Sequence, residues 1–199
     1  MAMANRRQRA YSRAMTQTVS RRTLLHAGGL LLAGTIVGIS VPEALAAPAA
    51  VELIASDGRI VAVTHWRPAR RAVGTILFSH GALSSPAAYD LLILPWVDAG
   101  YAVWAPLHVD SLAHPRRADF PGLKSWAARI EDMQLLARHV GAKSWIAAGH
   151  SYGGLVALTM GGASPVPPPG YSGTMAAPGV SAVVAFSPPG PMPGLVEPG

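Results

Sequence analysis

The hexapeptide Gly149-His150-Ser151-Tyr152-Gly153-Gly154 lies between an apolar run, Trp145–Ala148, and a helix-forming run that starts at Tyr152. It contains Gly-x-Ser-x-Gly in the strand-to-helix context that a nucleophile elbow requires. The sharp turn of such an elbow strains the backbone of the serine, and only small residues fit two positions to either side. The turn also places the serine hydroxyl at the positive end of a helix dipole. We therefore predict that Ser151 is a nucleophile and that the backbone N–H of Tyr152 binds a developing oxyanion.

A second motif, Phe78-Ser79-His80-Gly81-Ala82, ends another apolar run about 70 residues earlier in the chain. The carboxyl ends of parallel strands meet at one edge of a sheet, where ligands bind, so we expect this motif beside the elbow. Gly81 allows a tight turn, and the backbone N–H of Ala82 is the predicted second oxyanion donor. His80 and Gly81 are the predicted substrate-binding residues.

The apolar runs outside these motifs alternate between strand and helix periodicity. Strands are predicted over Val51–Ala55, Arg59–Trp66, Val73–Phe78, Tyr101–Leu107, Trp145–Ala148 and Ser181–Phe186, and helices over Pro86–Ala99, Leu123–Val140 and Tyr152–Met160. Asp57-Gly58 predicts a tight hairpin, and Gly141 a helix C-cap. This order predicts a largely parallel sheet covered by helices. Residues 144–196 carry no Asp, Glu, Lys or Arg, which predicts a place at the centre of the sheet, shielded on both sides.

The hairpin, the His-Gly loop, the elbow and the strand that ends at Phe186 together resemble the α/β-hydrolase fold. The resemblance covers residues 51 to about 191. It implies one three-layer α/β domain, residues 47–199, with an N-terminal hairpin and a mostly parallel sheet that lacks the last strands of the fold.

The stretch Phe186-Ser187-Pro188-Pro189-Gly190-Pro191, taken with Phe78-Ser79-His80-Gly81, narrows this resemblance. It resembles the branch that contains dienelactone hydrolase, chlorophyllase and platelet-activating-factor acetylhydrolase. Members of the fold hydrolyse esters, thioesters or amides through an acyl-serine. The resemblance therefore implies a serine hydrolase that acts on a small-molecule ester or acyl substrate, with no metal and no cofactor.

Residues 1–46 have the order of an export signal. Ser20-Arg21-Arg22 resembles a twin-arginine motif, Ala27–Val41 is an uncharged apolar run, and Ala44-Leu45-Ala46 offers a peptidase site. We predict export by the twin-arginine machinery, cleavage after Ala46, and a periplasmic or secreted product. The alternative is a retained membrane anchor, but this glycine-containing run is shorter than the ~20 residues that cross a bilayer.

The basic charge of the sequence belongs to this leader. Lys and Arg outnumber Asp and Glu by 16 to 10, but residues 1–46 hold six arginines and a single acid, Glu43. The rest of the chain is therefore nearly neutral and shows no basic face, which argues against a nucleic-acid partner. The absence of cysteine excludes disulfides, thiolate metal sites and a cysteine nucleophile.

No histidine or aspartate follows Ser151, and Glu197 is the only acid after it. The resembled fold places its acid and then its histidine after the nucleophile, so Glu197 is a candidate for the acid and no triad is complete. Of the upstream histidines, His80 borders the oxyanion loop, whereas His150 is expected to pack away from the serine. We interpret the sequence as a fragment of a longer hydrolase. The alternatives are a non-catalytic binding protein and an inactive truncated remnant.

His108, Asp110 and His114 follow the predicted strand Tyr101–Leu107. Two histidines and a carboxylate can bind zinc. We favour a loop that lines the mouth of the active-site cleft, with Asp110 capping a turn and the histidines at its rim, because the resembled fold needs no metal.

Overall fold

The computed structural model describes residues 47–197, and the predicted leader, residues 1–46, lies outside this part of the chain. Six strands form one sheet in the order β1-β2-β4-β3-β5-β6. Their bounds are β1 Ala49–Ile54, β2 Ile60–Trp66, β3 Gly74–Ser79, β4 Tyr101–Pro106, β5 Trp145–His150 and β6 Val180–Phe186. β2 pairs antiparallel with β1 and β4, whereas the β4–β3, β3–β5 and β5–β6 pairs are parallel. The predicted hairpin and the largely parallel sheet are confirmed.

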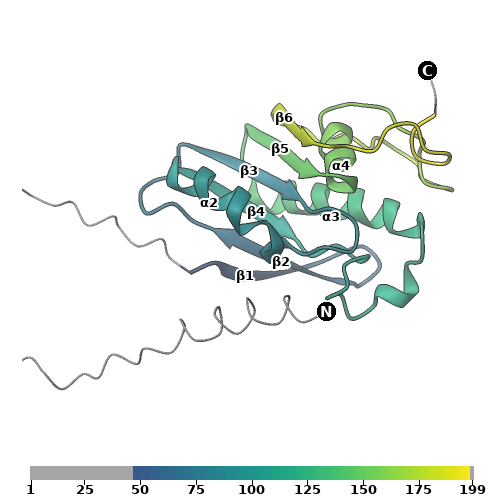
Figure 1. Ribbon diagram of the computed structural model, residues 1–199, viewed down its shortest axis with the longest axis horizontal. Helices are drawn as coiled ribbons and strands as arrows, with labels where there is room; N and C mark the ends of the chain where they lie inside the picture. Colours follow the sequence, from purple (N-terminus) through teal and green to yellow (C-terminus); the bar gives the residue numbers. More distant parts are fainter. Residues whose placement is uncertain (1–46, 198–199) are drawn as a thin grey trace, which may run out of the picture. The chain divides into compact units, whose positions relative to one another are not determined.

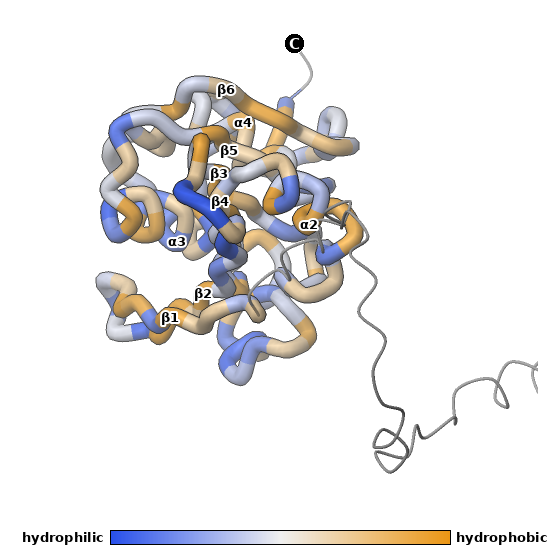
Figure 2. The backbone as a smooth tube through the Cα atoms, turned by 90° about the vertical axis from the view of Figure 1, so that its left-hand side faces the viewer, coloured by the Kyte–Doolittle hydropathy of each residue, from blue (hydrophilic) through white to orange (hydrophobic). Residues whose placement is uncertain are grey.

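Helices cover both faces of this sheet (Figures 1 and 2). Helix α2 (Asp90–Asp98) packs on one face, and helices α3 (Lys124–Val140) and α4 (Tyr152–Met160) pack on the other. Alternation along β3 explains both cores, since Leu77 packs with α3 and α4 while Ile76 and Phe78 pack with α2. The predicted three-layer α/β fold with a mostly parallel sheet is therefore confirmed for the described residues.

The helix predicted over residues 86–99 is two elements in the structure. A 3-10 turn, η1 (Pro86–Tyr89), precedes α2. Its tighter winding is visible in the Ala88 N–H, which donates to the Ser85 carbonyl three residues back at 3.2 Å. Helix α3, by contrast, ends as predicted, because Gly141 takes a left-handed φ of 63° at its C-cap.

The position of β6 contradicts one expectation from the sequence. Among the described residues β6 lies at the edge of the sheet, and Val183 and Val184 are 37% and 36% exposed. The uncharged stretch is therefore not shielded on both sides throughout. A low content of charged residues identifies an apolar strand but does not determine its place in the sheet, because that place depends on pairing with distant segments.

No helix in residues 47–197 is both long and apolar enough to cross a membrane.

The first turn of α4 packs directly against the end of β3. A Cβ on Gly153 would overlap the carbonyl groups of Ser79 and His80, and a Cβ on Gly149 would overlap the carbonyl of Gly153. Both positions therefore require glycine for steric reasons. This close approach sets how near the elbow lies to the loop after β3.

We expect Gly153→Ala to lower the free energy of unfolding by about 3 kcal/mol or more, because no rotamer change can relieve an overlap with backbone. Gly190→Ala is the matched control, since a Cβ there meets nothing within 4 Å. Its effect should stay within about 0.5 kcal/mol. Urea unfolding of both variants checks this, and equal losses of stability would contradict the close packing.

Candidate active site

Ser151 joins β5 to α4 in a strained backbone conformation, with φ 53° and ψ −121°. A non-glycine residue occupies such a region at a cost of about 1–3 kcal/mol, and only where the surrounding structure enforces it. Here the Ser151 N–H donates to the Phe186 carbonyl at 2.8 Å, and the Gly154 N–H donates to the Ser151 carbonyl at 2.8 Å. The predicted serine therefore has the backbone geometry of a nucleophile elbow.

The loop after β3 lies directly beside Ser151. A Cβ added to Gly81 would lie 3.5 Å from the Cβ of Ser151. Tyr89 bridges the loop and the elbow, because its hydroxyl oxygen accepts a hydrogen bond from the Gly81 N–H at 3.0 Å and lies 2.8 Å from Nδ1 of His150. The structure thus brings together the two motifs that the sequence predicts to be neighbours.

Two backbone N–H groups at this junction, those of Ala82 and Tyr152, donate to no other group among residues 47–197. The same two residues line a hollow of about 350 Å³ together with Leu83, Asp110 and Phe120. Unpaired N–H groups beside a hollow can bind an oxygen atom of a ligand. The junction therefore offers two donors and space for a small molecule. Ser151 adjoins this hollow through Tyr152 but is not one of the residues that line it.

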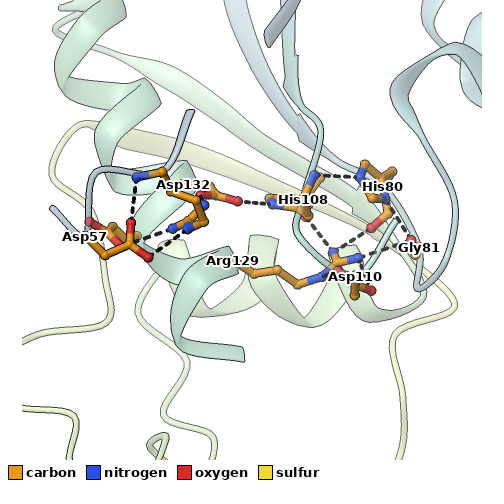
Figure 3. A network of polar contacts seen from close by, with 10 residues as sticks. Asp57, His80, Gly81, His108, Asp110, Arg129 and Asp132 are labelled. Carbon is orange, nitrogen blue, oxygen red and sulfur yellow. Dashed lines mark hydrogen bonds and ion pairs between the residues drawn. The ribbon is translucent and has the colours of Figure 1, made fainter. Parts of the chain in front are cut away.

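A buried guanidinium group, that of Arg129 on α3, lies against the loop (Figure 3). Its Nε and Nη2 lie 2.8 and 2.9 Å from the two carboxylate oxygens of Asp110. Its Nη1 and Nη2 donate to the carbonyls of His80 and Gly81 at 2.7 and 3.2 Å. Asp110 in turn accepts a hydrogen bond from the Leu83 N–H at 3.4 Å. A buried ion pair persists only when its remaining hydrogen-bonding groups are satisfied, as they are here.

A chain of polar groups runs through the same buried region (Figure 3). Oγ of Ser79 lies 2.9 Å from Nε2 of His108, Nδ1 of His108 lies 2.8 Å from Asp132, and Asp132 pairs with Arg59 at 2.8 Å. Serine, histidine and aspartate here follow the order of a catalytic triad. All three are 0% exposed, however, so a substrate has no access to Ser79. These hydrogen bonds instead connect the end of β3 to α3 and to the segment after β4.

Burial shifts the pKa values of these groups. It lowers the pKa of both His80 and His108 well below 6.5, and the nearby Arg129 lowers them further. Burial raises the pKa of Asp132 to about 6 despite its pairing with Arg59. Burial also acts to raise the pKa of Asp110, but the hydrogen bonds and charge of Arg129 outweigh it and lower that pKa. At neutral pH the two histidines are therefore neutral and Asp110 is ionised.

The structure contradicts the expectation that the His80 side chain contacts a substrate. Its Nδ1 bonds to the Gly81 carbonyl at 2.7 Å, and its Nε2 accepts the N–H of His108 at 3.0 Å. Both ring nitrogens are thus occupied and the ring is buried, so His80 is also excluded as a base for Ser151 in this conformation. Gly81, in contrast, does lie beside the serine.

The segment after β4 does not form the exposed rim expected from the sequence. His108, Asp110 and His114 are all buried, and Asp110 pairs with Arg129 rather than only capping a turn. Both ring nitrogens of His108 are already hydrogen-bonded, Nε2 to Ser79 and Nδ1 to Asp132. Across residues 47–197 no group of three or more histidines or acids is arranged to hold a metal ion.

Glu197, the acid candidate, makes no hydrogen bond to a histidine among the described residues. Its carboxylate accepts the Gly194 N–H at 3.3 Å in an exposed turn. His80, His108 and His150 each bond to groups other than Ser151. The described part of the chain therefore contains no complete triad for this serine.

The buried charges of α3, Arg129 and Asp132, are not predicted from the sequence. Arg129 and Asp132 are polar residues on an otherwise amphipathic helix, which suggests a solvent-exposed face. Steps of three residues from Trp126, however, place both on the buried stripe of the helix. This spacing, with Asp110 as an available counter-charge, is the signal that could have identified them.

No family model and no curated protein sequence matches this chain. Among solved structures, a puromycin hydrolase matches at 22% identity and a TM-score of 0.47 over 55% of this chain and 19% of its own. A lipase in its open form matches at 22% identity and a TM-score of 0.43 over 55% of this chain and 38% of its own. A thermostable carboxyl esterase from Bacillus coagulans matches at 20% identity and a TM-score of 0.44 over 58% of this chain and 39% of its own. The chain thus matches less than two fifths of the length of each of these structures.

The stability of the protein should fall as the pH is lowered from 7 to 5. His65, His80 and His108 have lowered pKa values in the folded state, that of His65 being about 4, whereas unfolded histidines bind a proton near 6.5. Because the unfolded state then binds more protons, the free energy of unfolding decreases with falling pH. Asp132 has the opposite effect, because its pKa is about 6 in the folded state and 3.8 in the unfolded state. Between these values the folded protein binds one proton more at Asp132, which stabilises it as the pH falls.

Urea unfolding at pH 5, 6 and 7 measures this balance. We expect a net uptake of about two protons on unfolding between pH 5 and 6 from His65, His80 and His108 less Asp132. His114, whose pKa is also lowered by burial, adds to this uptake. A free energy of unfolding that does not change with pH would contradict the burial of neutral histidines.

Proposed function

We propose that the protein is a serine hydrolase that cleaves a carboxylic ester or a related acyl bond through an acyl-serine intermediate. The observation that supports this best is the strained turn at Ser151, placed beside Gly81 and flanked by the unpaired N–H groups of Ala82 and Tyr152. Ser187 also has a positive φ, of 45°, so the proposal rests on the strain at Ser151 taken together with the two unpaired donors.

In the proposed reaction the hydroxyl oxygen of Ser151 attacks the carbonyl carbon of the substrate and gives its proton to a base. The carbonyl oxygen gains negative charge, which the N–H groups of Ala82 and Tyr152 and the N-terminus of α4 stabilise. The tetrahedral intermediate then expels the alcohol, which takes up a proton. Water hydrolyses the acyl-serine in the second half of the reaction.

We propose that the base and the acid that activate Ser151 come from outside residues 47–197. The bonds already made by His80, His108 and His150 support this. Glu197 makes no hydrogen bond to a histidine among residues 47–197, which supports it further. In the resembled fold, the acid and the histidine follow the nucleophile along the chain.

The proposed substrate is a small molecule, in keeping with the hollow of about 350 Å³ beside the oxyanion donors. Leu83 and Phe120 give this hollow apolar walls suited to an acyl or alkyl group. The resemblance to the dienelactone hydrolase, chlorophyllase and platelet-activating-factor acetylhydrolase branch supports an ester in particular.

A second candidate function is a non-catalytic binding protein built on the same fold. The observation that favours it is the lack of a complete triad for Ser151 in the described residues. Such a protein would use the same hollow to hold a ligand without cleaving it.

Ser151→Ala should abolish hydrolysis of p-nitrophenyl acetate by the protein produced in its native host, reducing turnover by at least about 10³-fold because the nucleophile is lost. Ser172→Ala, which removes an exposed hydroxyl, is the matched control and should keep full turnover. Turnover that survives Ser151→Ala would contradict the proposal. A wild-type protein that binds the ester without cleaving it would favour the binding protein instead.

We also propose that the protein is exported by the twin-arginine machinery and cleaved after Ala46, as the composition of residues 1–46 suggests. Replacing Arg21 and Arg22 together by lysine should retain the uncleaved protein inside the cell, because this export machinery requires the arginine pair. Replacing Arg6 and Arg7 by lysine is the control and should leave export intact. Cell fractionation and N-terminal sequencing check this, and a wild-type protein that starts at Met1 would contradict it.

A further inference from the structure

We propose that Arg129 is the positioning residue that fixes both oxyanion donors of the active site. This inference rests on the proposed function, because it explains how the N–H groups of Ala82 and Tyr152 keep their relative positions. The two groups belong to different segments, the loop after β3 and the start of α4, and lie 70 residues apart in the sequence. Arg129 contacts both segments from a third element, α3.

The edges of the guanidinium hold the loop. Nη2 of Arg129 donates to the Gly81 carbonyl at 3.2 Å, and Nη1 donates to the His80 carbonyl at 2.7 Å. The Gly81 carbonyl and the Ala82 N–H belong to one planar peptide unit and point in opposite directions. Holding that carbonyl toward Arg129 therefore directs the Ala82 N–H away from it. Asp110 also fixes this loop, because it binds Arg129 and accepts a hydrogen bond from the Leu83 N–H.

The face of the same guanidinium holds the elbow. Cζ of Arg129 lies 4.5 Å from the centroid of the Tyr152 ring, within the range of a cation–π contact. Trp126, one turn earlier on α3, stacks on the same ring at 5.7 Å between centroids. Because the Tyr152 ring is held by α3, the backbone N–H of this residue is held with it.

Only an arginine can make all of these contacts at once. A guanidinium has five N–H donors in a fixed planar fork and a flat face, whereas a lysine ammonium has three donors on a single atom and no face. Arg129 is 0% exposed, so bulk solvent does not compete for its contacts. Arg129→Lys therefore keeps the charge that Asp110 needs but removes the link between the two segments.

Amide order parameters from ¹⁵N relaxation of the protein test this link without requiring catalysis. In the wild type, Ala82 and Tyr152 should both be near the rigid value of about 0.85. In Arg129→Lys we expect both to fall toward about 0.6, while residues in the middle of β3 and α3 stay rigid. A second variant, Arg129→Met with Asp110→Asn, removes both charges together, so that no unpaired charge is left buried, and should give the same result.

Arg59→Lys is the matched control, because Arg59 is a buried arginine of the same polar network that pairs with Asp132 and contacts neither donor segment. It should leave the order parameters of Ala82 and Tyr152 unchanged. Loss of order in only one of the two segments, or in neither, would overturn the proposal. Failure of both Arg129 variants to fold would also overturn it, since Arg129 would then serve the fold as a whole.

Ester turnover separates this inference from the proposed function. If both hold, Arg129→Lys should lower kcat about 10²-fold with KM changed less than about threefold, because the donors act mainly in the transition state. If the wild type cleaves no ester, the proposed function fails, and the order parameters still decide whether Arg129 links the segments. A kcat equal to that of the wild type, with both segments mobile, would overturn the positioning role.

Discussion

The first turn of α4 and the end of β3 approach so closely that no side-chain carbon fits between them, and the geometry of the candidate site follows from this contact. Gly153 allows it, because a Cβ there would overlap the carbonyls of Ser79 and His80, and Gly149 allows the same turn of α4 to lie against the end of β5. The contact places the strained Ser151 beside Gly81 and leaves the N–H groups of Ala82 and Tyr152 at one junction. A steric constraint on two glycines thus determines where a reaction could take place.

Buried charge supplies the rigidity that this close contact needs. Arg129 and Asp110 form an ion pair whose remaining donors and acceptors bind the backbone of the loop, and the chain from Ser79 to Arg59 ties the same strand end to α3. Such groups would destabilise a core if left unpaired, so their complete pairing is itself a constraint on the shape of the site. The low pKa values of His80 and His108 follow from the same burial.

Much of the fold could be predicted from the sequence, because the elbow and the apolar strands have local signatures. The hairpin and the left-handed Gly141 depend on residues close together in the chain, and each strand is visible as a local apolar run. The edge position of β6 and the burial of His80 could not be predicted, since both depend on contacts with distant segments. Arg129 was missed for a related reason: its partners come from two other parts of the chain, and only the folded protein shows that they meet.

If Ser151 is an activated nucleophile, it will form a covalent adduct with an electrophile that reacts with such serines. The protein isolated from its native source would be treated with a fluorophosphonate, digested and mapped by mass spectrometry. We expect one phosphonylated residue, Ser151, formed with loss of fluoride. A protein that stays unmodified, or an adduct on another residue such as Ser79, would contradict it.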